Sequence, residues 1–282
     1  MLNTFTRCAN LVFYEWKRAL AKKKFFVLVI LTLALQIIVF LSFNYLFSNP
    51  PELLDVEELK TTMWLVGVLG PQELFMPLIA IVIAGGSMSE EYEQGTADVL
   101  LTKPIKKSEY MVGKYLGGFS LSSFVITLTS ALGVALAYGF FGPQEFLLYV
   151  PLICLALVYA NVLFFSLGFM FSEVLRRTTL AILAAIGIFV ASMLIGGYLA
   201  VIYAMTQEEF YLTLSRWIPN WSVSNLPGFV ASEFITVPTN PFLSVPSGDF
   251  QLAAAIIATY AVLCVVVTAI RLTRSDISKK AT

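Results

Sequence analysis

The sequence predicts an all-α integral membrane protein with six transmembrane helices. Of its 282 residues, 58% are hydrophobic and only 13% are charged, and the mean hydropathy is +0.82. Soluble domains carry roughly twice that share of charged residues, about 25%. The apolar residues also gather into charge-free runs, each long enough to cross a hydrocarbon core of roughly 30 Å as a helix. These runs, together with the uneven placement of Lys and Arg, predict the topology.

Six segments are expected to span the membrane. They are residues 25–47, 72–89, 116–141, 146–171, 178–205 and 251–270. The third and fourth, and the fourth and fifth, are separated by only a few residues, so these pairs form antiparallel hairpins. A shorter apolar segment, Met63 to Gly70, precedes the second span. It either lies at the outer membrane interface, with Trp64 as an anchor, or extends the second span.

Residues 1–24 show the spacing of an amphipathic helix. Its apolar face holds Phe5, Cys8, Ala9, Val12, Phe13, Trp16, Ala19 and Leu20, and its basic groups are Arg7, Lys17, Arg18 and Lys22 to Lys24. We expect this segment to lie along the membrane surface, with its basic groups near anionic headgroups. Membrane lipid is therefore an expected partner.

Residues 206–250 form a long, broken segment before the last span. They contain five of the chain's twelve prolines, together with Trp217 and Trp221. Irregular, polar backbone is not stable in the hydrocarbon core. We expect an extracellular loop with short interfacial helices.

The basic residues predict the orientation. Of the 18 Lys and Arg residues, 16 fall on one predicted face, and only Lys60 and Arg216 fall on the other. We expect the protein to lie in the cell membrane. The positive-inside rule then places both termini and the loop of residues 90–115 in the cytoplasm.

Several function classes are disfavoured by composition. The chain has no His, and its three cysteines, Cys8, Cys154 and Cys264, are expected to be small buried hydrophobes rather than disulfide partners. The dipeptide Gly113-Lys114 lacks the upstream glycine and the following Ser or Thr of a phosphate-binding loop. A net charge of zero provides no general field for nucleic acid. We therefore expect no catalytic residue, cofactor or metal on this chain.

The expected spans also lack the charged residues of ion-driven carriers. Apart from Glu73, assigned to the outer surface, they contain no Asp, Glu, Lys or Arg. Carriers driven by ions commonly place such a residue inside the bilayer. A driving force supplied by another protein is the better hypothesis.

The loop of residues 90–115 is where that force is expected to enter. Glu90 to Leu101 can continue the second span as a helix that ends at Lys103-Pro104, and Ser108 can cap the helix leading into the third span. Apolar residues at the tip, including Leu100, suit docking into a groove on another protein.

At this loop the sequence resembles the ABC-2 type permeases, the membrane subunits of ATP-binding-cassette transporters. The resembling residues are Glu91-x-Glu93-x-Gly95-Thr96, Leu100-Leu101-x-x-Pro104 and Gly113-Lys114, together with Glu15-x-Lys17-Arg18 near the start of the chain. With the six-span layout, the likeness covers the whole chain as one transmembrane domain.

The resemblance implies two contacts with a separate ATP-binding subunit, which would carry ATP and Mg. The coupling loop would supply Glu90, Glu91, Glu93, Gly95, Thr96, Asp98, Leu100, Leu101, Pro104, Gly113 and Lys114. The turn after the fourth span would supply Glu173, Arg176 and Arg177. It also implies a homodimer or heterodimer of permease copies and, from the tendency of the family, export of a substrate.

Structural alternatives stand beside these residue assignments. The acidic residues Glu90, Glu91 and Glu93 would also suit a solvated helix face, and Gly95 would also relieve crowding against a neighbouring helix. Two amides within the spans, Gln36 and Asn161, either line a substrate path or form hydrogen bonds between helices.

Three other functions are left open by the sequence. The first is a secondary transporter or channel that needs no partner. The second is a membrane enzyme using a carboxylate such as Glu73 or Glu233, although no paired acid or nucleophile motif supports it. The third is a membrane anchor for a signalling ATPase without transport.

Overall fold

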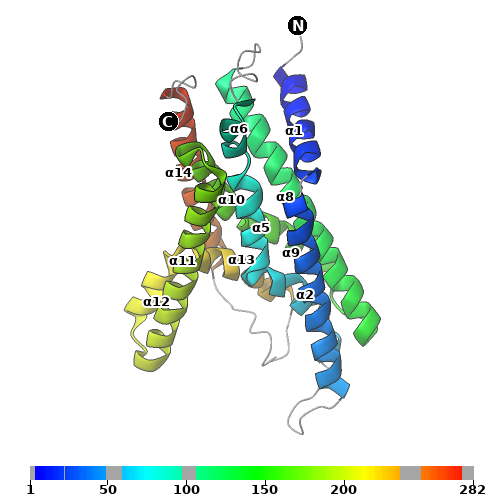
Figure 1. The fold of residues 1–282 in the computed structure, drawn as a ribbon. Helices are drawn as coiled ribbons and strands as arrows, with labels where there is room; N and C mark the ends of the chain where they lie inside the picture. Colours follow the sequence, from blue (N-terminus) through cyan, green and yellow to red (C-terminus); the bar gives the residue numbers. More distant parts are fainter. Residues whose placement is uncertain (1–3, 22, 49–58, 97–105, 236–248, 275–282) are drawn as a thin grey trace.

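The computed structural model describes residues 4–21, 23–48, 59–96, 106–235 and 249–274, and its regular elements in these ranges are all helices. The all-α prediction is therefore confirmed. In chain order the elements are α1 Thr4–Leu20, α2 Lys23–Ser48, α4 Met63–Leu69, η1 Gly70–Glu73, α5 Phe75–Gly85, α6 Ser89–Glu93, α8 Lys107–Phe141, η2 Leu147–Tyr149, α9 Val150–Ala160, α10 Val162–Leu175, α11 Thr178–Thr206, α12 Glu209–Arg216, α13 Pro219–Phe234 and α14 Phe250–Arg274. The long helices run side by side as a bundle (Figure 1).

The described residues contain five helical segments that are long and apolar enough to cross a bilayer. They are Phe25–Ser48, Lys107–Phe141, Leu147–Leu175, Thr178–Thr206 and Phe250–Arg274. A bent pair, Met63–Glu73 and Phe75–Glu93, adds a sixth if it counts as one span. The chain is thus a multi-pass membrane protein with five or six crossings.

The second predicted span, residues 72–89, is not a continuous helix. The helical segments Met63–Glu73 and Phe75–Glu93 meet at an angle of 43°, with the break at Leu74. Pro77 lacks the N–H that would bind the carbonyl of Glu73, four residues earlier, and its ring obstructs that carbonyl. Proline therefore explains the position of the bend. A second interruption, at residues 86–88, separates α5 from α6.

Helix α4 is a buried element, and of the two alternatives for this segment, the one with Trp64 as an interface anchor is wrong. The Trp64 side chain has no exposed surface, and its Nε1 donates a hydrogen bond to the Glu145 carbonyl at 2.8 Å. Gly67 of α4 lies against Gly133 of α8, where a Cβ on Gly133 would come within 2.7 Å of the Gly67 backbone. The two glycines let the helices touch, so α4 extends the broken second crossing inside the protein.

Part of the predicted outer loop packs into the bundle. In α13, Val223, Leu226 and Phe229 are buried in a core cluster with Phe164 of α10 and Ile257 of α14. The description of α13 as an interfacial helix is therefore incomplete, because one face belongs to the core. The membrane side of this segment stays a prediction.

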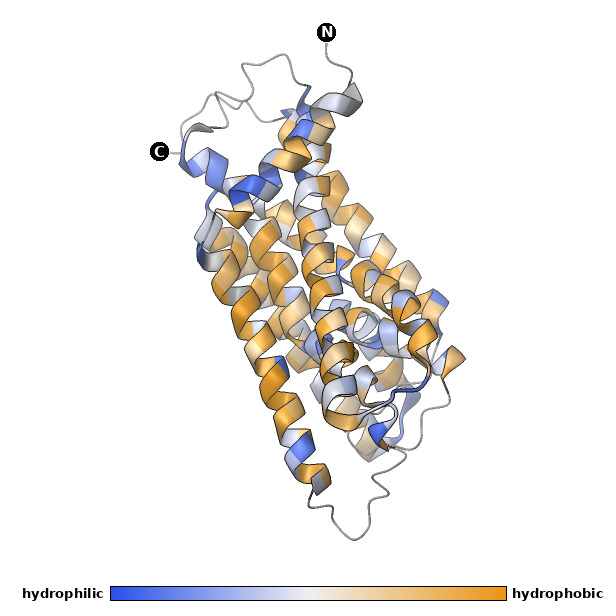
Figure 2. Ribbon diagram, turned by 90° about the vertical axis from the view of Figure 1, so that its right-hand side faces the viewer, coloured by the Kyte–Doolittle hydropathy of each residue, from blue (hydrophilic) through white to orange (hydrophobic). Residues whose placement is uncertain are grey.

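The start of α1, helix α6, the start of α8 and the end of α14 gather at one end of the bundle (Figure 1). Lys107 at the start of α8 donates a hydrogen bond to the Leu272 carbonyl near the end of α14. Hydrophilic residues gather near this end, whereas the helices beyond it are largely hydrophobic (Figure 2). We call it the polar end of the bundle.

Candidate functional site

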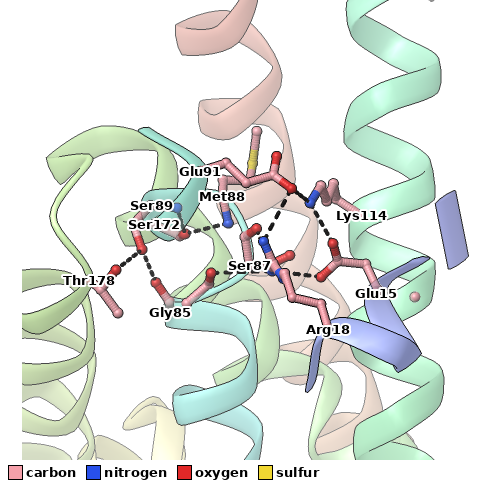
Figure 3. A network of polar contacts seen from close by, with 12 residues as sticks. Glu15, Arg18, Gly85, Ser87, Met88, Ser89, Glu91, Lys114, Ser172 and Thr178 are labelled. Carbon is pink, nitrogen blue, oxygen red and sulfur yellow. Dashed lines mark hydrogen bonds and ion pairs between the residues drawn. The ribbon is translucent and has the colours of Figure 1, made fainter. Parts of the chain in front are cut away.

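Four charged side chains from three helices meet at the polar end (Figure 3). We call Glu15 and Arg18 of α1, Glu91 of α6 and Lys114 of α8 the four-charge cluster. The Lys114 ammonium contacts the carboxylates of both Glu15 and Glu91. Arg18 donates from Nη2 to Glu15 at 2.7 Å and from Nη1 to Glu91 at 3.2 Å. The cluster therefore joins α1, α6 and α8.

The cluster is buried and balanced in charge. Lys114 is 0% exposed, Glu91 1% and Glu15 4%. Two carboxylates face two cations, which matters because an unpaired buried charge costs several kcal/mol, about 3–5 when one partner is removed. Burial alone would lower the pKa of Arg18, but the neighbouring Glu15 and Glu91 raise it above its usual value. The Arg18 guanidinium is therefore expected to stay protonated.

Arg18 also stabilises the interruption between α5 and α6. Its Nη2 donates hydrogen bonds to the Gly86 carbonyl at 3.3 Å and to the Ser87 carbonyl at 2.8 Å. These carbonyls lie where the helical hydrogen-bond ladder is broken, so the guanidinium supplies donors that the helix does not. The side chain is thus turned inward, and the prediction that Arg18 lies near lipid headgroups is wrong.

Aromatic groups complete the surroundings of Glu91 and Lys114. The Tyr110 hydroxyl donates a hydrogen bond to Glu91 Oε2. The Lys114 ammonium lies 5.1 Å from the centre of the Tyr14 ring and 5.5 Å from that of Tyr110. Both oxygens of Glu91 therefore have donors, and the cation also interacts with ring faces.

Two glycines allow the close approach of α1 and α8. A Cβ on Gly113 would lie 2.7 Å from the Leu11 Cβ, and one on Gly117 would lie 2.7 Å from the Glu15 Cβ. Glycines four residues apart lie on one helix face and let another helix backbone pack against it. The Gly113-x-x-x-Gly117 spacing therefore brings Glu15 within reach of Lys114.

A second set of contacts joins α6 to α10 and α11. The Ser172 hydroxyl of α10 accepts hydrogen bonds from the backbone N–H groups of Met88 at 2.9 Å and Ser89 at 2.8 Å (Figure 3). Ser89 Oγ lies 3.0 Å from Thr178 Oγ1. Glu93 accepts from the Thr178 N–H at 2.9 Å, which caps the start of α11.

The turn after α10 makes a further contact with α6. The Tyr92 hydroxyl donates to Glu173 Oε2, and Arg176 donates to Glu173 Oε1 at 3.3 Å. The Arg176 guanidinium lies over the Tyr92 ring, 4.6 Å from its centre. The two regions predicted as separate contact sites, around Glu91 and around Glu173, are thus connected through α6.

A family model for an ABC-2 family transporter protein matches residues 9–277, nearly the whole chain. The chain belongs to this family. A search of curated proteins finds no match. Membership makes the chain a membrane permease of an ABC transporter and implies that it pairs with an ATP-binding subunit.

Several predicted contact residues lie inside this ABC-2 permease rather than on its surface. Lys114, Glu91 and Glu173 are buried, and Gly113 packs against α1. The alternative of a solvated helix face is therefore wrong for Glu91. Glu90 is half-buried, and Glu93 is exposed although it caps α11. Their binding to an ATP-binding subunit stays a prediction.

Gly95 ends α6 in the left-handed conformation, with φ of 66°. Among the described residues, a Cβ at this position would meet no atom within 4 Å, so none of them supports the alternative that Gly95 relieves crowding. Glycine is favoured there because other residues are strained at positive φ. Thr96 follows, and its hydroxyl donates to the Glu91 carbonyl at 3.4 Å. The other predicted coupling residues, Asp98, Leu100, Leu101 and Pro104, lie outside the described residues.

Two smaller outcomes concern the ends of helices. Ser108 does not cap α8, because the helix begins at Lys107 and the Glu109 carboxylate accepts the Lys106 N–H at 3.2 Å. At the second predicted contact, Arg176 adopts φ of 53° and ends α10, whereas Arg177 is exposed.

The two amides in the spans form hydrogen bonds between helices. Gln36 Nε2 donates to the Gly67 carbonyl at 2.7 Å and to the Thr129 carbonyl at 3.1 Å. Asn161 Nδ2 donates to Gln72 Oε1 at 2.8 Å. Gln36 is 4% exposed and Asn161 0%. The structure therefore favours helix packing over the pathway-lining alternative for both.

Sequence reasoning missed the partners that complete the site. Glu15 and Arg18 were part of the resemblance, but their pairing with Glu91 and Lys114 was not predicted, because it joins positions far apart in the chain. Ser172 was missed entirely. Its signal was weak: one polar residue at the end of an apolar run.

Proposed function

We propose that two copies of this permease form a transmembrane pathway and that an ATP-binding subunit docks at the polar end of each copy. The observation that carries the proposal is the four-charge cluster, which ties the coupling helix α6 to α1 and α8. A docking surface must be connected firmly to the spans if it is to transmit force. At the polar end α6 is connected both to α1 and α8, through the four-charge cluster, and to α10 and α11, through Ser172 and Thr178.

The proposed mechanism uses these connections in turn. ATP-driven closure of the partner subunits pushes α6, which would bend freely at residues 86–88 if it had no other support. Glu91 passes the displacement to α8 through Lys114, and Ser89 and Glu93 pass it to α11 through Thr178. The spans then tilt together and switch the pathway between the two faces of the membrane.

The proposed dimer is supported by the open surface of α11. Among the described residues, a Cβ on either of the adjacent Gly196 and Gly197 would meet no atom within 4 Å, whereas one on Gly85 or Gly168 would contact a neighbouring helix. Small residues at an open helix face suit close packing against another helix in the membrane. A second copy of the chain provides such a helix.

Export is the proposed direction because outward transport dominates among ABC-2 permeases.

The expected spans, with Glu73 assigned to the outer surface, contain no other Asp, Glu, Lys or Arg that could bind a driving ion. Coupling to ATP through a partner therefore accounts for the sequence better than ion-driven transport does.

Copurification tests the proposed function. The genes adjacent to the one for this chain are searched for a stand-alone ATP-binding subunit. The subunit is coexpressed with the permease, and we expect the two to purify as a complex. Replacing both Leu100 and Leu101 by Asp should abolish the complex, whereas the control Leu148→Asp, at a residue that is 86% exposed elsewhere, should retain it. Unchanged binding of the double variant, or solute movement by the purified chain alone down an ion gradient, would contradict the proposal.

A further inference from the structure

A hydrophobic groove runs between α1 and α8 at the polar end. It has a volume of about 750 Å³ and is lined by Cys8, Ala9, Val12, Phe13 and Trp16 of α1 and by Val112 and Leu116 of α8. Its size lies within the roughly 300–1,000 Å³ of sites that hold small molecules. The lining side chains are almost entirely apolar, so the groove suits a hydrocarbon chain.

The walls of the groove are held in place by the protein. The indole Nε1 of Trp16 donates a hydrogen bond to Ser120 Oγ at 2.9 Å, and its ring lies 5.5 Å from the Phe124 ring, centre to centre. The indole N–H is therefore occupied, and the ring carbons remain to line the groove. Phe13, also of α1, is 64% exposed.

A cation lies at the edge of this apolar surface. The exposed Lys17 ammonium is 5.3 Å from the centre of the Phe13 ring. Helix α1 has a single acidic residue, Glu15, and its carboxylate faces the four-charge cluster. The groove therefore combines a hydrocarbon lining with a positive charge, which matches an anionic lipid and does not match a zwitterionic one as well.

We propose that the groove between α1 and α8 binds one acyl chain of an anionic phospholipid of the surrounding bilayer and that Lys17 contacts its headgroup. The proposal goes beyond the transport function and does not depend on it. Val12 and Trp16 flank the groove on the same helix that carries Glu15 into the cluster, and Val112 and Leu116 flank Lys114 on α8. A bound chain thus braces the helix pair whose other side holds the Glu15–Lys114 contact.

Fluorescence quenching by brominated lipids tests the proposal on the full-length chain without a partner subunit. The protein is reconstituted in vesicles that contain brominated phosphatidylglycerol or brominated phosphatidylcholine. The Trp16 contribution is the difference between the wild type and Trp16→Phe. We expect this contribution to be quenched at a several-fold lower mole fraction of the anionic lipid than of the zwitterionic one.

Two variants separate the headgroup from the chain. Lys17→Gln should remove the preference for the anionic lipid, and Ala9→Phe, which fills the groove, should reduce quenching by both lipids. Matched controls outside the groove are Arg274→Gln and Ala255→Phe, both at exposed positions of α14, and these should quench like the wild type.

Two results would contradict the proposed lipid site. Equal quenching of the wild type by both lipids would mean ordinary contact with the bilayer and would overturn the site. Absence of quenching by either lipid would mean that protein, such as a second copy, covers the groove, and would overturn it as well. Both results leave copurification with the ATP-binding subunit unaffected, so they are distinguishable from a failure of the proposed function.

Discussion

The ammonium group of Lys114 contacts the carboxylate of Glu91, although the two residues lie 23 positions apart on opposite sides of the coupling loop. The contact joins α6 to α8, the described helices on either side of the coupling loop. Because the same ammonium also contacts Glu15 of α1, all three helices are linked at one point.

Loss of one charge from the cluster should destabilise the protein. Lys114→Met leaves two buried carboxylates with Arg18 as their remaining cation in the cluster, and we expect a loss of about 3–5 kcal/mol in unfolding free energy. Thermal unfolding in detergent measures the effect, with Arg274→Gln as an exposed control. The double variant Glu91→Gln with Lys114→Met restores neutrality and should recover much of the loss. A double variant as unstable as Lys114→Met would argue against charge balance as the cause.

The glycine contact between α1 and α8 can be tested by comparing two glycines of α8, Gly117 and Gly139. Gly117→Ala places a Cβ 2.7 Å from that of Glu15 and should cost about 1–3 kcal/mol through overpacking. The added Cβ of Gly139→Ala in the same helix meets no atom of the described residues within 4 Å, and this variant should stabilise α8 by up to about 1 kcal/mol through helix propensity. Melting temperatures of the two variants should therefore move in opposite directions. A rise in both melting temperatures would show that helix propensity, not the α1 contact, dominates at Gly117, and a fall for Gly139→Ala would contradict the open surroundings of that residue.

Gly95 should be sensitive to substitution because of its backbone conformation. Gly95→Ala forces a Cβ into the left-handed region and is expected to cost about 1–2 kcal/mol. Gly70→Ala is the matched control, since Gly70 has φ of −55° and equally open surroundings. Hydrogen exchange of residues 89–96 measures the effect on α6 locally. Equal protection in the two variants would mean that the conformation of Gly95 does not hold the end of α6.

Ser172 should matter for the connection between α6 and α10. Ser172→Ala leaves the buried N–H groups of Met88 and Ser89 without that acceptor, at a cost of about 1–3 kcal/mol. Ser123→Ala, whose hydroxyl bonds only to the Phe119 carbonyl of its own helix among the contacts described, is the control. We expect Ser172→Ala to lower the melting temperature and to reduce the response of the partner ATPase to the permease. If the partner ATPase responds to the Ser172→Ala permease as it does to the wild type, force does not pass through this contact.

Much of the fold could be predicted because it depends on local composition. Charge-free runs identify the spans, and the family resemblance rests on residues within the coupling loop. The bend at Leu74 was harder, because Pro77 was visible but its effect on the Glu73 carbonyl depends on the surrounding packing. Trp64 was ambiguous for a similar reason: an apolar aromatic suits either an interface or a core.

The location of the site could be predicted from the sequence, but the contacts that form it could not. The loop containing Glu91 and Lys114 was identified as the coupling region, yet these residues were expected to contact a partner, and the structure buries them. Arg18 was assigned to the lipid surface because helical periodicity cannot show which carboxylates another helix will bring. Such pairings are tertiary, and a single sequence contains no direct signal for them.

Site-specific cross-linking tests the central claim most directly, namely that an ATP-binding subunit docks at the polar end. A cysteine replaces exposed Gln94 at the end of α6 or, as a control, Tyr138, which is 59% exposed near the other end of α8. Both variants carry alanine in place of the three native cysteines. We predict that the Gln94→Cys variant cross-links to the ATP-binding subunit and that the Tyr138→Cys variant does not. A cross-link from Tyr138→Cys with none from Gln94→Cys would contradict the account.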